Sequence, residues 1–306
     1  MSYELQKATS RLENIRSVKP ILAALRTISL GSWQMARNRR RSIQAFSHRL
    51  LGLLPILVPH LVQRGMSKAR RWARGDPQSA RASGRAILLV VGSERGLVGG
   101  YNRALLESVW AFLEKREFGE IELMALGSRM VRILTQGGMV PSWSRALSLT
   151  RLPEYALAYG LVQEWLERYE AYDIDSVHII YNADRGAGRY MSTSHRLLPP
   201  VLPEHSLSTA GRMDPRFHEV IVETDPVSLY ATVVQQWTAT SLYGTLIEAA
   251  LTEHAARYQL MESATQNADD LIEALMLIVQ SARRQAITRE MQELAVSAGL
   301  LTGEGR

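Results

Sequence analysis

The chain has 306 residues, 46% of them hydrophobic and 22% charged, which is the composition of an ordinary soluble protein with one or two domains. No apolar run reaches the ~20 residues needed to span a bilayer, since glycine and prolines interrupt the longest, Leu50 to Val62. The absence of cysteine excludes disulfides and cysteine-ligated metals. The net charge of +6 predicts an acidic partner, either nucleic acid, anionic lipid or an acidic protein surface.

The first predicted element is one long helix from Tyr3 to Leu57. Its apolar residues recur at three- and four-residue steps and are Ile15, Val18, Leu22, Leu25, Ile43, Phe46, Leu50, Leu53 and Leu57. This spacing is typical of a coiled-coil seam. The inward positions in the middle of the helix hold Ser29, Ser32, Ala36 and Arg39. We therefore expect a looser partner, or a third surface, in that part of the helix.

Positive charge is concentrated in two segments. The first, within the predicted helix, consists of Arg37, Arg39, Arg40 and Arg41. The second lies in a predicted loop from Gly65 to Gly84, which is rich in Arg, Ser and Gly. Such clusters either bind an acidic partner or form a solvated face, and for the second cluster the pattern favours neither.

The middle of the chain alternates predicted strands and helices. The strands are Ala86–Val91, Ile121–Leu126, Ser176–Tyr181 and, as an edge strand, His218–Glu223. The helices between them are Asn102–Lys115, a short one ending at Thr135, and Leu152–Tyr169. Because the strands are continuous apolar runs, the pattern predicts an α/β layer with a mainly parallel sheet.

The last predicted helix runs from Asp225 to about Ala298, with aspartate as its N-cap and Pro226 in its first turn. Its seam residues are Met261, Ala264, Ala268, Leu271, Leu275, Ile278 and Ala282. We expect the two terminal helices to form a long antiparallel two-helix coiled coil that carries a central α/β domain. The predicted division is 1–60 for the first helix, 61–85 for the basic loop, 86–224 for the α/β domain and 225–300 for the last helix.

A glycine-rich segment, Gly92 to Asn102, joins the first strand to the following helix. Glycines at such a turn can bind phosphate through backbone N–H groups, but the spacing matches neither a dinucleotide fingerprint nor a P-loop. Glu94 would also repel an anion. We therefore interpret Gly96, Gly99 and Gly100 as a structural turn. The separated histidines lack metal-ligand spacing, and no catalytic triad or carboxylate pair stands out, so we expect no catalytic, cofactor-binding or metal site.

Near the end of the last helix, hydrogen-bond donors are concentrated within two turns. They are Arg283, Arg284, Thr288 and Arg289. The simplest interpretation is a solvated helix face, but the same set suits contact with acidic loops of a partner.

These residues resemble the gamma-subunit family of rotary F-type ATP synthases over essentially the whole chain. The C-terminal stretch is the most specific, and its matching residues are Glu253, Arg257, Met261, Ala264 to Ala268, Ala282-Arg283, Ala286 to Thr288 and Glu290. The glycine turn matches a family element in which Glu94 and Val98 replace aspartate and cysteine. Further matches are Tyr181-Asn182, Leu197 to Pro199, Glu223 with Asp225-Pro226, and Ser241 to Tyr243.

The chain also departs from the family pattern. Ala23, Ala24 and Leu25 replace a lysine-isoleucine-threonine segment, and Arg284 replaces a glutamine. Gly31 and Trp33 also stand where the family has small or branched apolar residues. The chain therefore resembles a divergent branch of the family.

The resemblance implies a non-catalytic rotor shaft that couples ion flow through a membrane ring to ATP synthesis or hydrolysis on partner beta subunits. The implied partners are the alpha and beta subunits of the catalytic head, an epsilon-type subunit and the membrane rotor ring. The expected partner contacts are Arg37, Arg39, Arg40, Arg283, Arg284, Thr288 and Arg289. The implied location is peripheral, on the cytoplasmic face of the cell inner membrane, without insertion and without nucleic acid. Two alternatives are a basic α/β nucleic-acid-binding protein and a nucleotide-binding α/β enzyme.

Overall fold

The computed structural model describes residues 3–63, 84–115, 117–148, 151–186, 188–199 and 223–297. The helices are α1 (Tyr3–Gln63), α3 (Tyr101–Glu114), α4 (Ser128–Gln136), α5 (Tyr155–Glu170) and α7 (Pro226–Ser297). The strands are β1 (Arg85–Val91), β2 (Glu120–Leu126), β3 (Trp143–Arg145), β4 (Ser176–Asp184) and β5 (Tyr190–Leu198). The chain divides into two compact units, residues 1–28 with 258–306 and residues 29–257, and α1 and α7 contribute to both.

In the first unit, α1 and α7 pair in antiparallel directions. Arg26 binds Glu262 at 2.9 Å, and Lys19, two turns earlier in α1, pairs with Asp269, two turns later in α7. Apolar side chains pack between the helices, namely Leu5, Ala8, Leu12 and Ile15 from α1 and Ile272, Leu275, Val279 and Ala282 from α7. The predicted antiparallel coiled coil is therefore confirmed in this unit.

The seam in α7 differs from the predicted one at two positions. Leu271 and Ile278 are about half exposed, whereas Ile272 and Val279 pack in the interface. At 100° per residue, position i+4 lies 40° from position i around the helix, and position i+3 lies 60° away. Consequently Ile272 and Val279 lie closer to the line through Ala268 and Leu275. The predicted seam was also wrong in α1 at Val18, Phe46 and Leu53, which are exposed.

In the second unit, five strands form one sheet in the order β3-β2-β1-β4-β5. Strands β1, β2, β3 and β4 are parallel, and β5 pairs with β4 in antiparallel direction. The prediction of a mainly parallel sheet is confirmed. Two strands were not predicted: β3, which has only three residues, and β5, most of whose residues are polar. The predicted strand His218–Glu223 falls almost entirely outside the described residues, as does the predicted basic loop.

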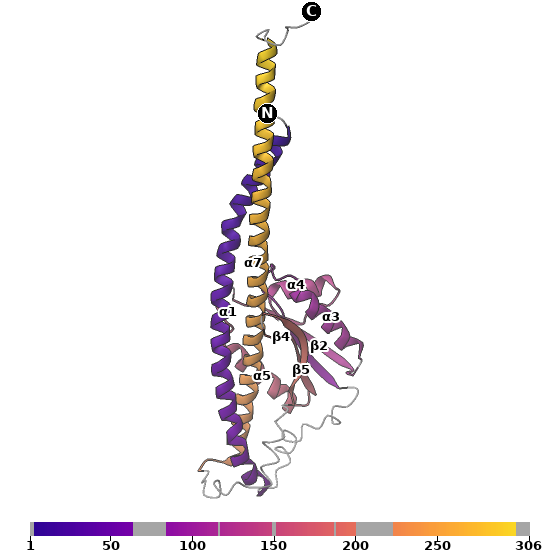
Figure 1. The fold of residues 1–306 in the computed structure, drawn as a ribbon. Helices are drawn as coiled ribbons and strands as arrows, with labels where there is room; N and C mark the ends of the chain where they lie inside the picture. Colours follow the sequence, from indigo (N-terminus) through magenta and orange to yellow (C-terminus); the bar gives the residue numbers. More distant parts are fainter. Residues whose placement is uncertain are drawn as a thin grey trace, which may run out of the picture. The chain divides into compact units, whose positions relative to one another are not determined.

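Each face of the sheet is covered by its own helices (Figure 1). Ile87 and Leu89 of β1 are fully buried and face α5 and α7, while Leu88 and Val90 face α3 and α4. This alternation follows from the two-residue period of a strand. The sheet therefore has a core on both faces. Burial of each such side chain stabilises the fold by about 1.5–3 kcal/mol.

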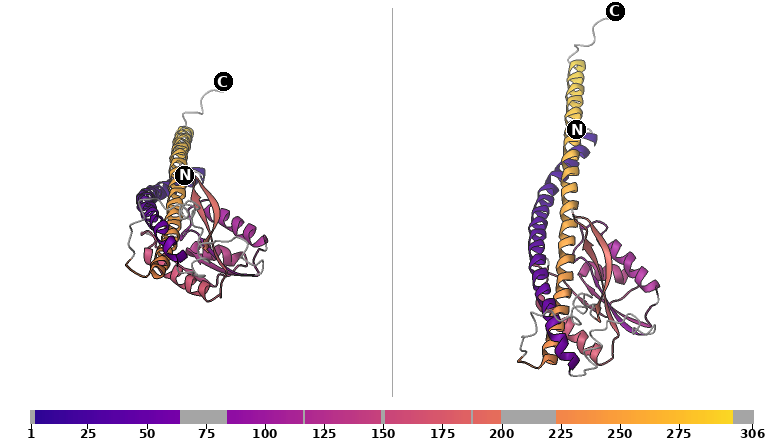
Figure 2. Two further views of the ribbon diagram at one scale, coloured as in Figure 1. Left: turned by 90° about the horizontal axis from the view of Figure 1, so that it is seen from below. Right: turned by 60° about the horizontal axis from the view of Figure 1, so that its bottom comes forward.

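Helices α1 and α7 also lie side by side within the second unit (Figure 1 and Figure 2). Leu54 and Leu57 of α1 pack against Tyr230 and Val233 near the start of α7. Helix α1 ends at Gln63, six residues later than predicted. The predicted N-cap of the last helix is confirmed, because the Asp225 carboxylate accepts a 3.1 Å hydrogen bond from the Ser228 N–H.

Candidate functional site where helix α7 meets the sheet

The glycine turn between β1 and α3 is held by hydrogen bonds of its own residues. The buried Ser93 donates its N–H to the Asn102 side chain at 3.0 Å and accepts the Asn102 amide at 2.7 Å. Gly99 adopts φ +58°, where a side chain is strained, whereas a methyl group at Gly96 or Gly100 would meet no atom within 4 Å. Of the three predicted turn glycines, Gly99 is the one whose backbone requires glycine.

The carboxylate of Glu94, a residue of this turn, binds the start of α4 and the segment after β3. It accepts hydrogen bonds from the Ser128 N–H at 2.9 Å, the Ser128 hydroxyl at 2.6 Å and the Leu147 N–H at 2.7 Å. Partial burial raises the pKa of Glu94, but the bonds from Ser128 and Leu147 outweigh it and hold the pKa below its usual value. The side chain thus caps the N-terminus of α4. The N-terminus of α4 is therefore already occupied by a carboxylate of the chain itself.

A buried polar cluster joins the sheet and α3 to α7. The Tyr101 hydroxyl donates to the Ala249 carbonyl at 3.0 Å, and Thr252 donates to the Asn182 carbonyl at 2.9 Å. The Asn182 amide in turn donates to the Tyr101 carbonyl at 3.0 Å. Burial, reinforced by the charge of Glu253, raises the pKa of Tyr101 far above its usual value, so its hydroxyl remains a donor. This cluster fixes α7 against the ends of β4 and α3.

A second set of bonds connects α1, α7 and β4. The Arg40 guanidinium lies 3.0 Å from the Asp184 carboxylate and 3.3 Å from that of Glu248. Glu248 also accepts the Asp184 backbone N–H at 3.1 Å. One guanidinium therefore pairs with two carboxylates.

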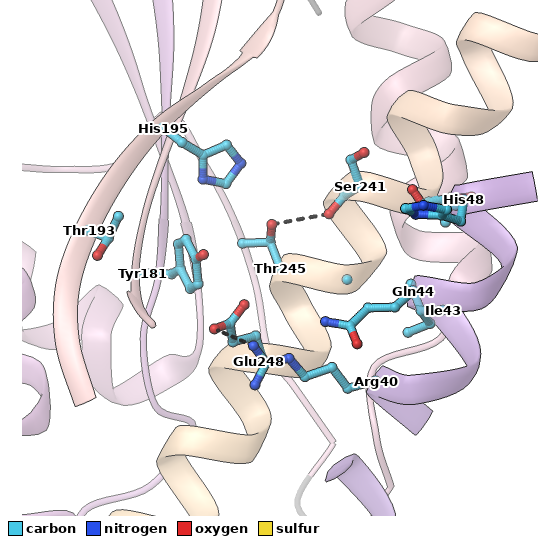
Figure 3. A pocket seen from close by; sticks show the side chains of 13 residues that line it. Arg40, Ile43, Gln44, His48, Tyr181, Thr193, His195, Ser241, Thr245 and Glu248 are labelled. Carbon is cyan, nitrogen blue, oxygen red and sulfur yellow. Dashed lines mark hydrogen bonds and ion pairs between the residues drawn. The ribbon is translucent and has the colours of Figure 1, made fainter. Parts of the chain in front are cut away.

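A cavity of about 700 Å³ lies beside these charges (Figure 3). Its side chains come from α1, α7, β4 and β5, and the polar ones include Arg40, Gln44, His48, Tyr181, Thr193, His195, Ser241, Thr245 and Glu248. Burial lowers the pKa of His195, and the pKa of Tyr181 is raised to about 12, chiefly by burial and then by the charge of Glu248. The cavity is therefore lined both by the charged Arg40 and Glu248 and by polar groups such as Tyr181 and His195.

The predicted partner contacts fall into two groups. In the second unit, Arg37 is exposed, while Arg39 donates to the Tyr243 hydroxyl at 3.0 Å and Arg40 binds its two carboxylates. In the first unit the other four are exposed, namely Arg283, Arg284, Thr288 and Arg289. Their roles in contacting a partner stay predictions, and Arg39 and Arg40 have internal roles that the sequence did not indicate.

An apolar stripe near the end of α7 was not predicted from the sequence. Ile287, Met291 and Leu294 are 57%, 66% and 68% exposed. Their i, i+4, i+7 spacing places them on one helix face. That spacing is visible in the sequence and could have identified them. These three side chains give α7 an exposed apolar stripe.

None of the helices in the described ranges combines the length and the apolar content that a membrane span requires. The family model described as ATP synthase matches residues 4–300. Among curated relatives, the ATP synthase gamma chain of Geobacter sp. (strain M21) is 28% identical over 98% of this chain and 99% of its own length. That of Parafrankia sp. (strain EAN1pec) is 26% identical, over 98% of this chain and 99% of its own length.

Similar folds occur in solved structures of rotary complexes. A chain of the Euglena gracilis mitochondrial ATP synthase, in its OSCP/F1/c-ring structure, matches with a TM-score of 0.61 and 16% identity, over 99% of this chain and 97% of that one. A chain of the Tetrahymena thermophila mitochondrial ATP synthase central stalk and c-ring matches with a TM-score of 0.54 and 17% identity, over 80% of this chain and 99% of that one. At these identities the likeness concerns the fold.

Proposed function

We propose that this chain, which belongs to the ATP synthase family, is the gamma-type rotor shaft of a rotary ATP synthase and has no catalytic role of its own. It couples ion flow through a membrane ring to ATP synthesis or hydrolysis on partner beta subunits. The observation that carries the proposal is that α7 pairs with α1 in both units and is hydrogen-bonded to the α/β domain in the second. A helix held in this way can transmit torque between a partner at its end and a partner on the domain.

The shaft acts by presenting different faces to identical catalytic subunits. A ligand or partner shifts a conformational equilibrium only by contacting the two states differently. Two unlike helices form an asymmetric surface, so each beta subunit around it meets a different set of side chains. This supports rotation-driven change in the catalytic sites without catalytic residues on this chain.

The exposed cations and the apolar stripe are the proposed contacts with the catalytic head. The cations that face acidic loops are Arg37, Arg283, Arg284 and Arg289. Each ion pair of one arginine with a loop carboxylate contributes under about 1 kcal/mol, so no single pair stops rotation. Ile287, Met291 and Leu294 contact an apolar surface of the alpha and beta subunits that surrounds the end of α7. Apolar contacts are non-directional and therefore permit α7 to rotate against this surface.

Membership of the family supports a proposal for the remaining partners and the location. We propose that the α/β domain, residues 86–224, contacts the membrane ring and an epsilon-type subunit. The helices, residues 1–60 and 225–300, would contact the alpha and beta subunits of the catalytic head. The chain is then peripheral to the membrane and lies on its cytoplasmic face. For nucleotide binding at the glycine turn, the alternative function, Glu94 is an obstacle because its negative charge within the turn repels an anion.

A rotation experiment tests the proposal directly. Because the chain has no cysteine, Glu114→Cys at the exposed end of α3 gives a single labelling site. A bead is attached to this cysteine, and a head of alpha and beta subunits assembled with the labelled chain is fixed to a surface. We expect ATP to drive unidirectional rotation of the bead. A stationary bead on a head that hydrolyses ATP would exclude the shaft function.

A further inference from the structure

A second cavity, of about 420 Å³, lies between α1, α5 and α7 in the second unit. This volume is in the range of cavities that bind small molecules. The apolar walls consist of Ile43 and Phe46 of α1, Tyr155 of α5 and Tyr243 of α7. Three helices that are distant in the sequence therefore contribute to one mostly apolar cavity.

The aromatic side chains give the cavity flat apolar walls. The rings of Tyr155 and Tyr243 meet edge to face, with their centroids 5.5 Å apart. Phe46 is 47% exposed, although its spacing predicted that it packs in the coiled-coil seam. A planar ring that enters the cavity buries this exposed aromatic surface and gains ring-to-ring contacts. The apolar part of a fitting ligand is therefore an aromatic ring.

Two polar side chains of the cavity have N–H donors that no bond within the described residues uses. Arg39 donates its Nε–H to the Tyr243 hydroxyl at 3.0 Å, and its guanidinium carbon lies 5.7 Å from the centre of the Tyr243 ring. The terminal nitrogens of this guanidinium have no acceptor in the part of the chain that the structure describes. The Gln236 side-chain oxygen accepts the Tyr155 hydroxyl at 2.7 Å, so the Gln236 amide nitrogen remains a donor.

The positive charge of Arg39 has no carboxylate partner among the described residues. Its acceptor is the neutral Tyr243 hydroxyl, and no acidic residue of the described ranges lines the cavity. In the larger cavity, by contrast, Arg40 pairs with Asp184 and Glu248. A guanidinium presents its terminal N–H groups as a planar fork that matches the two oxygens of a carboxylate. The polar part of a fitting ligand is therefore a carboxylate.

We propose that this cavity is a binding site for a small aromatic carboxylate. The carboxylate accepts hydrogen bonds from the terminal N–H groups of Arg39, and the ring packs against Phe46 and Tyr155. Because such a ligand contacts α1, α5 and α7 together, it binds the folded second unit and not the unfolded chain. It therefore raises the melting temperature of that unit.

The first test measures binding of naphthoate to the full chain alone, by a ligand-observed NMR titration. We expect a dissociation constant on the order of 1 mM, as for other ligands of about 13 non-hydrogen atoms. Naphthamide, which is neutral, and acetate, which has no ring, should each bind about ten-fold more weakly. Absence of naphthoate binding up to about 10 mM, or equally strong binding of either analogue, would overturn the proposed ligand class.

Variants locate the site. Arg39→Gln removes the charge and keeps a polar side chain, so we expect about ten-fold weaker naphthoate binding and no remaining preference for naphthoate over naphthamide. Phe46→Ala should also weaken naphthoate binding, because it removes one aromatic wall. Arg37→Gln is the matched control, since Arg37 is an exposed arginine of α1 that does not line the cavity. Wild-type preference in Arg39→Gln would overturn the contact between the guanidinium and the carboxylate.

Thermal unfolding separates lost binding from lost folding. Naphthoate at a saturating concentration should raise the melting temperature of the wild type and of Arg37→Gln, and raise that of Arg39→Gln less. If Phe46→Ala melts early without ligand, Ser42→Phe replaces it, because Ser42 is exposed and a ring there fills the cavity. Undiminished naphthoate binding in Ser42→Phe would overturn the site. Binding is measured on the chain alone and is therefore independent of the proposed shaft function.

Discussion

The Tyr101 hydroxyl and the Ala249 carbonyl lie 3.0 Å apart and join the first residue of α3 to the middle of α7. Tyr101 is 1% exposed, so the bond is shielded from water. A hydrogen bond inside a protein orients two elements more strictly than apolar contact does, because it fails when the donor angle changes. The bond therefore helps to fix α7 on the sheet, as Thr252 does through Asn182.

The first prediction concerns this bond. Tyr101→Phe removes the donor and leaves the ring in place, so we expect the free energy of unfolding of the second unit to fall by about 1–2 kcal/mol. Urea unfolding followed by circular dichroism measures the change. Tyr159→Phe is the matched control, since Tyr159 is partly buried and packs its ring against Tyr155. Equal losses in the two variants would show that the bond to Ala249 contributes nothing.

Local patterns in the sequence predicted the helices and most strands, but not β3 and β5. The run from Ala86 to Val91 predicted β1 to within one residue, because a buried parallel strand is apolar on both faces. Asp225 and Pro226 predicted the start of α7 because capping involves neighbouring residues. Both signals lie within a few residues of the structure they specify.

Contacts distant in sequence could not be predicted in this way. Tyr101 and Ala249 are separated by 148 residues, and no local pattern pairs them. Glu94 was expected to oppose anion binding, but its role as a cap for α4 depends on Ser128, 34 residues later. Likewise, Arg39 is a predicted partner contact, and its hydrogen bond to the Tyr243 hydroxyl becomes visible only once α1 and α7 are paired.

The second prediction is a pH dependence of stability due to His178. Its ring lies 5.2 Å from that of Phe112 and 5.0 Å from that of Phe118, between centroids. Burial, followed by the charges of Arg196 and His195, lowers its pKa to about 4. The unfolded chain has a histidine pKa of about 6.5. Between about pH 6.5 and 4 the unfolded state therefore binds a proton that the folded state does not, and stability falls as the pH falls.

Replacing His178 by leucine should remove this contribution. We expect the decline in unfolding free energy between about pH 6.5 and 4 to become shallower by up to about 1.4 kcal/mol per pH unit. Urea unfolding at a series of pH values measures it. His254, whose pKa burial and the charge of Arg257 also lower to about 4, should behave in the same way. An unchanged slope in His178→Leu would mean that this histidine is protonated in the folded state.

The third prediction concerns Gly127, between β2 and α4. Its φ is +96°, and a methyl group there would lie 2.6 Å from the Gly92 carbonyl oxygen and 2.7 Å from that of Ser93. Both are backbone atoms that cannot rotate away. We expect Gly127→Ala to lower the free energy of unfolding by about 2–4 kcal/mol.

Gly160 of α5 provides the contrasting substitution. A methyl group there meets nothing within 4 Å, and alanine favours a helix, so Gly160→Ala should raise the free energy of unfolding by about 0.5–1 kcal/mol. Urea unfolding of both variants measures the difference. A mild effect of Gly127→Ala would indicate that the ends of β1 and β2 can separate.

The fourth prediction concerns the end of α7. Deletion of residues 282–306 removes Arg283, Arg284 and the stripe of Ile287, Met291 and Leu294, none of which belongs to the unit formed by residues 29–257. We therefore expect nearly unchanged thermal unfolding of that unit but a large loss of ATP-driven ion pumping in the assembled complex. Calorimetry of the chain and flux measurements on vesicles provide the two values. A parallel collapse of both would contradict this separation.

The fifth prediction concerns the charge of Arg283 and Arg284, both exposed near the end of α7. Reversing both, Arg283→Glu with Arg284→Glu, converts attraction to acidic loops into repulsion. Exposed pairs contribute under about 1 kcal/mol each, so two reversals should slow ATP turnover of the complex by about ten-fold at low salt.

Ionic strength distinguishes this electrostatic effect from misfolding. Added salt screens exposed charges over a Debye length of about 3 Å at 1 M, against about 10 Å at 0.1 M. The difference in turnover between wild type and variant should therefore shrink as salt increases, whereas a folding defect would persist. Arg103→Glu on α3 is the control for an exposed arginine elsewhere. Turnover equal to wild type at low salt would mean that Arg283 and Arg284 only face solvent.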